Sequence, residues 1–276
     1  MAYITNRIFD GPLKAVILDW AGTTVDFGSF APTAVFIQLF ASRGVTVSVA
    51  QARAPMGLMK KDHLRAIAAQ PEVAAQWALR HGRAFSDADL DALFEDFIPM
   101  QMACLTEYAE PIPGVVATIA AMRARGLKIG STTGYTRAMM DVLVPEAARR
   151  GYQPDTWVGS DDTPAGRPAP WMIYQNAMQL DVFPMDAIVK IGDTFPDIEE
   201  GLNAGTWTIG LAMTGNLLGL TEAELNACPQ DELAERRNAI YAQLYHAGAH
   251  FVVDSLADCL PIFDEIDRLL KTGEKP

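Results

Sequence analysis

The chain has 276 residues, half of them hydrophobic, and a formal net charge of −12. This length and composition allow one large core or a core with a smaller inserted domain, and the acidic balance argues against nucleic acid or an anionic membrane as a partner. No apolar run approaches the roughly 18 residues of a spanning helix, and residues 1–14 lack a basic region followed by an apolar block, so a cytoplasmic protein is expected.

The first predicted strand, Ala15–Leu18, is an apolar run that ends at the carboxylate of Asp19. Apolar residues with β-branching, bounded by a polar turn, are typical of a buried parallel strand. Ligands of open α/β sheets bind at the carboxyl ends of the strands, so Asp19 is placed to act as a nucleophile or a metal ligand. In the turn that follows, Thr23 and Thr24 could contact a phosphoryl group or close the turn.

The next part of the chain, from about Phe27 to Leu105, is predicted to be wholly helical. This gap before the next strand is too long for a simple crossover, so we expect a helical cap domain inserted into a core domain. The cap is predicted to span 28–105 and the core 1–27 and 106–276, with hinges near 26–29 and 106–112. Pro111, Pro113 and Gly114 mark the second crossing. The predicted cap helices cover 33–43, 59–69, 72–83 and 87–105.

Further strands are predicted over 128–131, 188–191, 206–211 and 250–253, and they alternate with helical stretches. That alternation favours an α/β fold, a Rossmann-like parallel sheet with helices on both faces. The segment 216–245 is charged and predicted to be helical, and it shows no recognisable chemistry.

Polar residues follow the later strands. Thr133 and Tyr135 come after the strand at 128–131, Arg167 is a lone cation in a loop rich in Pro and Gly, and Asp193 and Asp197 follow the strand at 188–191. A nucleophilic Asp, then a Thr, a basic residue and an acidic pair, in this order from Leu13 to about Gly210, resemble the haloacid dehalogenase superfamily of phosphoryl-transfer enzymes.

Four segments are similar to one branch of that superfamily, the phosphonoacetaldehyde hydrolases or phosphonatases: 19–23, 56–63, 131–137 and 164–171. The resemblance implies hydrolysis of the carbon–phosphorus bond of phosphonoacetaldehyde to acetaldehyde and phosphate, in 2-aminoethylphosphonate degradation. It also implies Mg²⁺, a Schiff-base lysine and a homodimer formed through the cap. The apolar helix at 33–43 is compatible with such a dimer.

The resemblance also implies a role for each matching residue. Asp19 would form an aspartyl phosphate and Lys60 a Schiff base. Mg²⁺ would be held by Asp19, the backbone carbonyl of Ala21 and Asp193. Substrate contacts would come from Thr133, Arg167, Met56, Gly57, His63 and Tyr135, with Thr23 and Asp197 in support.

Lys60 and Lys61 are adjacent, and helical projection distinguishes them. At 100° per residue, Lys60 shares a side with Met56, His63 and other apolar residues, whereas Lys61 falls on another side. A desolvated amine near another cation has a depressed pKa, and its neutral form is the nucleophile that imine formation requires. Lys60 is therefore the predicted Schiff-base lysine, and His63 could tune its amine or relay protons.

Ala21 distinguishes between the possible reactions. Phosphatases of the superfamily usually carry a second Asp two residues after the nucleophile, and that acid protonates the departing alkoxide. Losing such an acid costs roughly 10²–10⁴ in rate. Cleavage of a carbon–phosphorus bond needs an electron sink instead, which an iminium on Lys60 would supply.

Three alternatives stay open from the sequence. A hydrolase of the same fold acting on phosphate monoesters is opposed by Ala21. A degenerate, non-enzymatic member is opposed by the presence of Asp19, Lys60 and Asp193. A dehalogenase attacking carbon would need neither the acidic pair nor the lysine.

Overall fold

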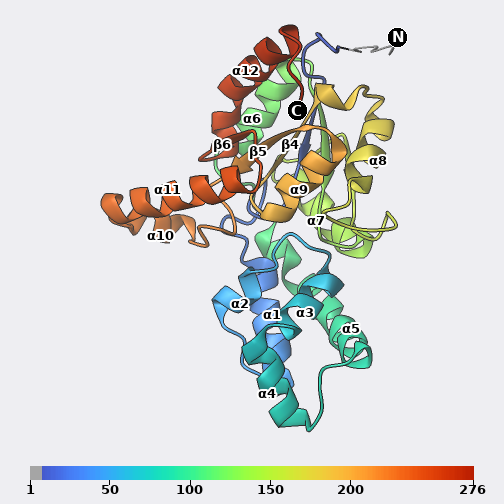
Figure 1. Cartoon of the computed structure of the whole chain (residues 1–276), viewed down its shortest axis with the longest axis vertical. Coiled ribbons are helices and arrows are strands. Elements are labelled where there is room, and N and C mark those ends of the chain that lie inside the picture. Colours follow the sequence, from blue (N-terminus) through green and yellow to red (C-terminus); the bar gives the residue numbers. More distant parts are fainter. Residues whose placement is uncertain (1–7) are drawn as a thin grey trace, which may run out of the picture.

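The computed structural model describes residues 8–276, in which a six-stranded parallel sheet forms the centre of the core (Figure 1). The strand order is β3-β2-β1-β4-β5-β6, so the first strand lies in the middle, between β2 and β4. The strands are β1 (Ala15–Leu18), β2 (Lys128–Thr132), β3 (Thr156–Val158), β4 (Ile188–Gly192), β5 (Trp207–Leu211) and β6 (Phe251–Val253).

Helices cover both faces of this sheet, as a fully buried parallel sheet requires. One face packs against α6 (Val115–Ala124), α7 (Arg137–Arg149) and α12 (Cys259–Lys271). The opposite face packs against α8 (Trp171–Leu180), α9 (Phe195–Ala204) and α11 (Gln230–His246). The predicted Rossmann-like α/β fold is confirmed.

After β1, and before η1 (Leu105–Tyr108) and α6, the chain forms five α-helices that lie together below the sheet (Figure 1). They are α1 (Ala31–Ser42), α2 (Val49–Arg53), α3 (Lys60–Ala68), α4 (Pro71–His81) and α5 (Asp87–Cys104). Phe36 of α1 stacks on Phe97 of α5 at 4.9 Å between ring centroids, and Phe40 packs edge-on against Trp77 of α4. The large apolar side chains of α1 are thus buried inside this cap, within one chain.

Two linkers join cap and core, the first near residues 26–29 and the second near 106–112. They run side by side, because a backbone bridge connects Val25 to Pro111. In the first linker Asp26 and Ser29 have φ angles of 56° and Gly28 of 82°. The left-handed region disfavours side chains. The carboxylate of Asp26 accepts hydrogen bonds from the N–H groups of Phe30 and Ala31, which caps the start of α1.

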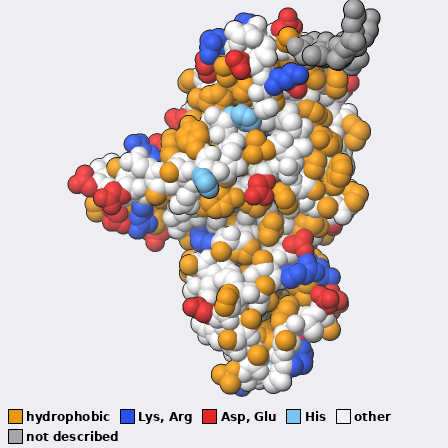
Figure 2. Space-filling model, viewed as in Figure 1, with side chains coloured by type: hydrophobic (Ala, Val, Ile, Leu, Met, Phe, Trp, Pro, Cys, Tyr) orange, Lys and Arg blue, Asp and Glu red, His pale blue; other side chains and the backbone are white. Residues whose placement is uncertain are grey.

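All five predicted strands are present, whereas β3 and α2 were not predicted. Both are short, three and five residues, and periodicity over so few residues carries little signal. The helices α10 (Glu222–Ala227) and α11 project from the core and are rich in charged side chains (Figures 1 and 2). Within residues 8–276, none of the helices is long and apolar enough to cross a membrane.

Candidate active site

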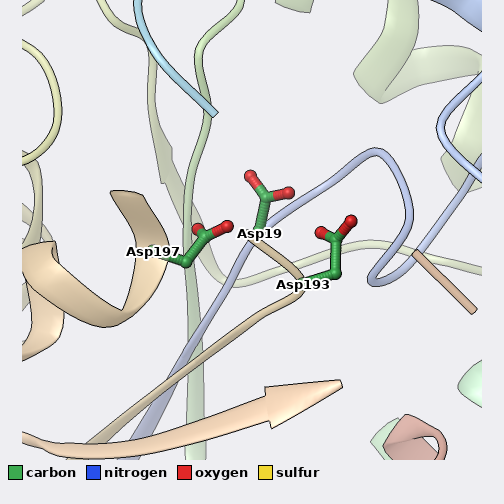
Figure 3. Close-up of side chains that lie close together, drawn as sticks. All are labelled: Asp19, Asp193 and Asp197. Atoms are coloured by element: carbon green, nitrogen blue, oxygen red, sulfur yellow. The ribbon is translucent and has the colours of Figure 1, made fainter. Parts of the chain in front are cut away.

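Three carboxylates from separate segments meet at the carboxyl edge of the sheet (Figure 3). Oxygen atoms of Asp19, Asp193 and Asp197 lie within 4.8 Å of one another. Asp19 follows β1 and Asp193 follows the neighbouring strand β4, so parallel pairing brings them together. Asp197 lies in the first turn of α9, where it forms a capping box with Thr194.

Asp193 is fully buried and is held by two donors. The Thr23 hydroxyl donates to Oδ1 at 3.0 Å, and the backbone N–H of Asn216 donates to Oδ2 at 2.7 Å. Burial, with repulsion from Asp19 and Asp197, raises the pKa of Asp193 well above its usual value. A Cβ on Gly22 or Gly215 would come within 2.4 Å of this side chain, so only glycine lets both loops enclose it.

Arg167 binds three of the buried carboxylates. Its guanidinium lies 2.6 Å from Asp19, 2.9 Å from Asp197 and 3.0 Å from Glu200. Burial would lower the pKa of Arg167, but the three carboxylates outweigh it and hold the pKa above its usual value. For the Asp19 carboxyl, burial has the opposite effect and raises the pKa, and the charge of Arg167 partly opposes this shift.

Lys190 and Glu200 belong to the same cluster and were missed from the sequence. The Lys190 amine lies 2.9 Å from Asp197 and 3.3 Å from Glu200, and both Lys190 and Glu200 are fully buried. A signal was available: Lys190 is the one charged residue of an otherwise apolar strand, and Glu200 follows Asp197 by three residues on the same helix face.

The charges of this cluster suit a metal ion. In the part of the chain that the structure describes, only Arg167 and Lys190 lie at salt-bridge distance from the four carboxyl groups of Asp19, Asp193, Asp197 and Glu200, which leaves two more carboxyl groups than paired cations. Burial would raise the pKa of Asp197, but Arg167 and Lys190 outweigh it and lower that pKa. Among residues 8–276, no cation pairs with Asp193 at salt-bridge distance. Buried acidic oxygens without a cation are the ligands that hard divalent metals prefer.

Lys60 reaches the site from the cap. It is the first residue of α3 and is 5% exposed, and its amine lies 4.6 Å from the centre of the Tyr135 ring. Burial lowers the pKa of Lys60 to about 8, with Asp19 opposing the shift. Lys61 is instead half-exposed and pairs with Asp91 at 2.5 Å, on another side of the helix, as the projection indicated.

His63 lies behind Lys60, away from the cavity. Its ring packs at a tilt against Phe36, with 4.0 Å between ring centroids, and Nε2 donates to the Ala52 carbonyl at 2.7 Å. Burial, together with Lys60, lowers the pKa of His63 to about 3. The imidazole is therefore neutral, and the idea that it lowers the Lys60 pKa as a cation is wrong.

A small cavity lies between cap and core. The predicted residues Asp19, Ala21, Met56, Gly57, Lys60, Thr133, Tyr135 and Arg167 line it, together with Ser29, Pro32, Gly134 and Thr194. Thr133 accepts a hydrogen bond from the Tyr135 N–H, and Thr24 closes its turn onto the Asp19 carbonyl. Thr23, Asp193 and Asp197 lie behind this lining.

Known proteins resemble this chain over nearly its whole length. Residues 13–205 match the haloacid dehalogenase-like hydrolases. Phosphonoacetaldehyde hydrolases from Syntrophobacter fumaroxidans and Nitratidesulfovibrio vulgaris are 50% and 49% identical, each over 99% of this chain and 99% or 98% of their own. The crystal structure of a phosphonoacetaldehyde hydrolase-like protein from Oleispira antarctica matches with a TM-score of 0.97 and 38% identity, covering all of both chains.

Proposed function

Because the chain belongs to the phosphonoacetaldehyde hydrolase family of the haloacid dehalogenase-like hydrolases, we propose that it cleaves the carbon–phosphorus bond of phosphonoacetaldehyde. One observation carries the proposal most. Lys60 from the cap and Asp19 from the core line the same small cavity, while Ala21 places a methyl group where an alkoxide-protonating acid would stand in a phosphatase. An amine nucleophile and a carboxylate nucleophile thus face one substrate.

The reaction begins at Lys60. The neutral amine attacks the aldehyde carbon and water leaves, which forms an imine whose protonated form withdraws electrons from the neighbouring carbon. A pKa of about 8 leaves an appreciable fraction of this amine neutral near pH 7.5. The ring of Tyr135 and the buried surroundings exclude water around it.

Asp19 then attacks phosphorus. Its carboxylate oxygen bonds to phosphorus as the carbon–phosphorus bond breaks, and the electron pair of that bond passes into the iminium to give an enamine. The enamine takes a proton at carbon, and hydrolysis of the resulting imine releases acetaldehyde and frees Lys60. A second water hydrolyses the aspartyl phosphate and regenerates Asp19.

Arg167 and Thr133 hold the phosphoryl group in this scheme. Arg167 presents a charged fork that is already fixed by Asp197 and Glu200, and Thr133 offers a hydroxyl at the cavity wall. We assign Mg²⁺ as the metal, with Asp19, the Ala21 carbonyl and Asp193 as its protein ligands. When bound, Mg²⁺ neutralises phosphoryl oxygens that would otherwise repel Asp19.

Borohydride trapping tests this function. Protein is incubated with phosphonoacetaldehyde and borohydride, and the modified peptide is mapped by mass spectrometry. A reduced two-carbon adduct on Lys60, absent in Lys60→Arg and unchanged in the neighbouring control Lys61→Arg, is expected, with phosphate release that requires Mg²⁺. Phosphate release from simple monoesters without any adduct would overturn the proposal.

A further inference from the structure

Arg53 is a cap residue whose buried charge has no place in the scheme above. It ends α2 and is 8% exposed. Within residues 8–276 no carboxylate lies within salt-bridge distance of it, and its Nε and Nη2 atoms are buried without hydrogen-bond partners. A buried, partly satisfied guanidinium is costly, so its retention calls for an explanation.

The contacts that Arg53 does make cross from the cap to the linker and the core. Nη1 donates to the Gly28 carbonyl in the first linker at 2.8 Å, and to the backbone and side-chain oxygens of Asn216 at 3.2 Å each. The Asn216 side-chain amide donates back to the Arg53 carbonyl at 3.3 Å. Cap, linker and core loop are therefore joined at one side chain.

Asn216 continues the connection into the active site. Its backbone N–H is the donor that holds Asp193 at 2.7 Å. Thr214, in the same loop, makes two further hydrogen bonds of 2.8 Å. Its carbonyl accepts from the Gly28 N–H, and its hydroxyl donates to the Gly22 carbonyl. The loop 214–216 is thus bonded to the linker on one side and to the turn around Asp193 on the other.

We propose that Arg53 is a positioning residue that couples cap closure to the metal site, through Asn216 and Asp193. With the cap closed, Arg53 fixes the loop whose N–H orients Asp193. Rotation about the first linker would withdraw Arg53 and release that loop. Coupling free energies are reciprocal, so a divalent cation at Asp193 favours the closed cap to the extent that closure favours the cation.

The inference rests on the proposed metal site, and it explains two further features of the structure. The linker that Arg53 holds contains Asp26 and Ser29 in the left-handed region, a backbone conformation that persists only where surrounding contacts enforce it. The segment 216–245, which showed no chemistry in the sequence, therefore begins with a residue that acts on the site.

The first test measures Mg²⁺ affinity by calorimetry, without substrate. Arg53→Met keeps an unbranched apolar side chain and removes the guanidinium, which carries every donor and lies 4.7 Å from the centre of the Phe30 ring. We expect its Kd for Mg²⁺ to rise about tenfold. Arg65→Met, which removes an exposed arginine of the same domain, should leave the Kd unchanged. An unchanged Kd in folded Arg53→Met would overturn the inference.

Asn216→Ala gives a second, independent variant, because it removes the side-chain acceptor and keeps the backbone N–H. It should weaken Mg²⁺ binding as well, and the double variant should be no weaker than the poorer single variant, since both changes break one connection. Additive losses would contradict the coupling. If Arg53→Met does not fold, this variant alone decides the matter.

Hydrogen exchange measures the reciprocal effect, that of Mg²⁺ binding on closure of the cap. In the wild-type protein Mg²⁺ should slow exchange over residues 26–30, and in Arg53→Met it should not. Equal protection in both proteins would refute the coupling. A wild-type protein that binds no divalent cation would instead refute the proposed metal site, so the two failures are distinguishable.

Discussion

At the scale of single residues, burial decides what each ionisable group can do. Lys60 and Lys61 are chemically identical neighbours, yet one is 5% exposed beside aromatic rings and the other forms an exposed ion pair. Desolvation disfavours the charged amine and lowers the pKa of Lys60 to about 8. The same burial keeps His63 neutral and leaves it a packing residue.

The pH dependence of imine trapping follows from this shift. Lowering the pKa of an amine from 10.5 to about 8 raises its neutral fraction at pH 7.5 from about one thousandth to about one quarter. The trapping rate should therefore climb with pH and reach half its maximum near pH 8. A half-maximum near 10.5, measured over the same pH series, would show that Lys60 is solvated in solution.

The buried charge cluster gives a prediction about stability. Lys190→Met leaves Asp197 and Glu200 short of a cation, and breaking a buried pair in this way costs about 3–5 kcal/mol. Urea unfolding should show that loss, and the double variant Lys190→Met/Glu200→Gln should recover part of it because the charge balance is restored. Lys61→Met, at an exposed pair, should cost less than about 1 kcal/mol.

At the scale of elements, the segment 53–60 between α2 and α3 is where the cap rests on the core. A Cβ on Gly57 would lie 2.3 Å from the Thr194 hydroxyl at the start of α9, and Met59 accepts a hydrogen bond from the Gly166 N–H. This short segment delivers both Lys60 and Arg53 to core partners, so its fit determines whether the site is complete.

Gly57→Ala should disturb that fit. Gly57 has a φ of 94°, and the added methyl meets both strain and the Thr194 side chain. We expect single-turnover cleavage to slow by about 10²-fold, as a misplaced catalytic group does. Gly82→Ala is the matched control, because Gly82 also has a positive φ, of 68°, but open space around it. Equal effects would indicate general destabilisation.

At the scale of the whole molecule, neither domain holds the site alone. The core supplies carboxylates, Arg167 and Thr133, and the cap supplies Lys60, Met56 and Gly57 to the same cavity. In the proposed mechanism, closure of the cap would exclude the water that hydrolyses reactive intermediates too early. The net charge of −12 belongs to the whole chain, and the excess of carboxyl groups over paired cations in the buried cluster is a separate, local feature.

Mg²⁺ should stabilise the folded protein. A ligand at 100 times its Kd adds about 2.7 kcal/mol to the free energy of unfolding, which corresponds to a rise in Tm of several degrees for a chain of this size. Differential scanning fluorimetry should show a saturable rise with Mg²⁺ and none with NaCl at equal ionic strength. Asp193→Asn should abolish it, and a shift that survives in this variant would place the cation elsewhere.

A homodimer is a prediction that rests on the resemblance alone. The large apolar side chains of α1 pack inside the cap, so they do not by themselves supply a dimer surface. Light scattering at micromolar concentration should give twice the mass of the chain. A monomer mass across the concentration range would contradict the dimer.

The local pattern of the sequence determined a large part of this molecule. Apolar runs followed by carboxylates identified β1 and β4, and helical periodicity identified the cap helices and separated Lys60 from Lys61. These features depend on neighbours along the chain, which is why they could be predicted. Asp19, Lys60, Arg167 and Asp193 were named from motifs. Asp19 and Asp193 meet because parallel strand ends share one edge of the sheet, whereas Lys60 arrives from the cap.

Only the tertiary structure decided which groups are partners. Glu200 pairs with Arg167, and the Asn216 N–H donates to Asp193; both contacts join segments distant in the chain. His63 is excluded from the site by packing against Phe36. The charges that act on Asp193, and the hydrogen bonds that connect it to Arg53 through Asn216, also come from such contacts. Electrostatic energies depend on distance and burial in three dimensions, so no pattern along the chain determines them.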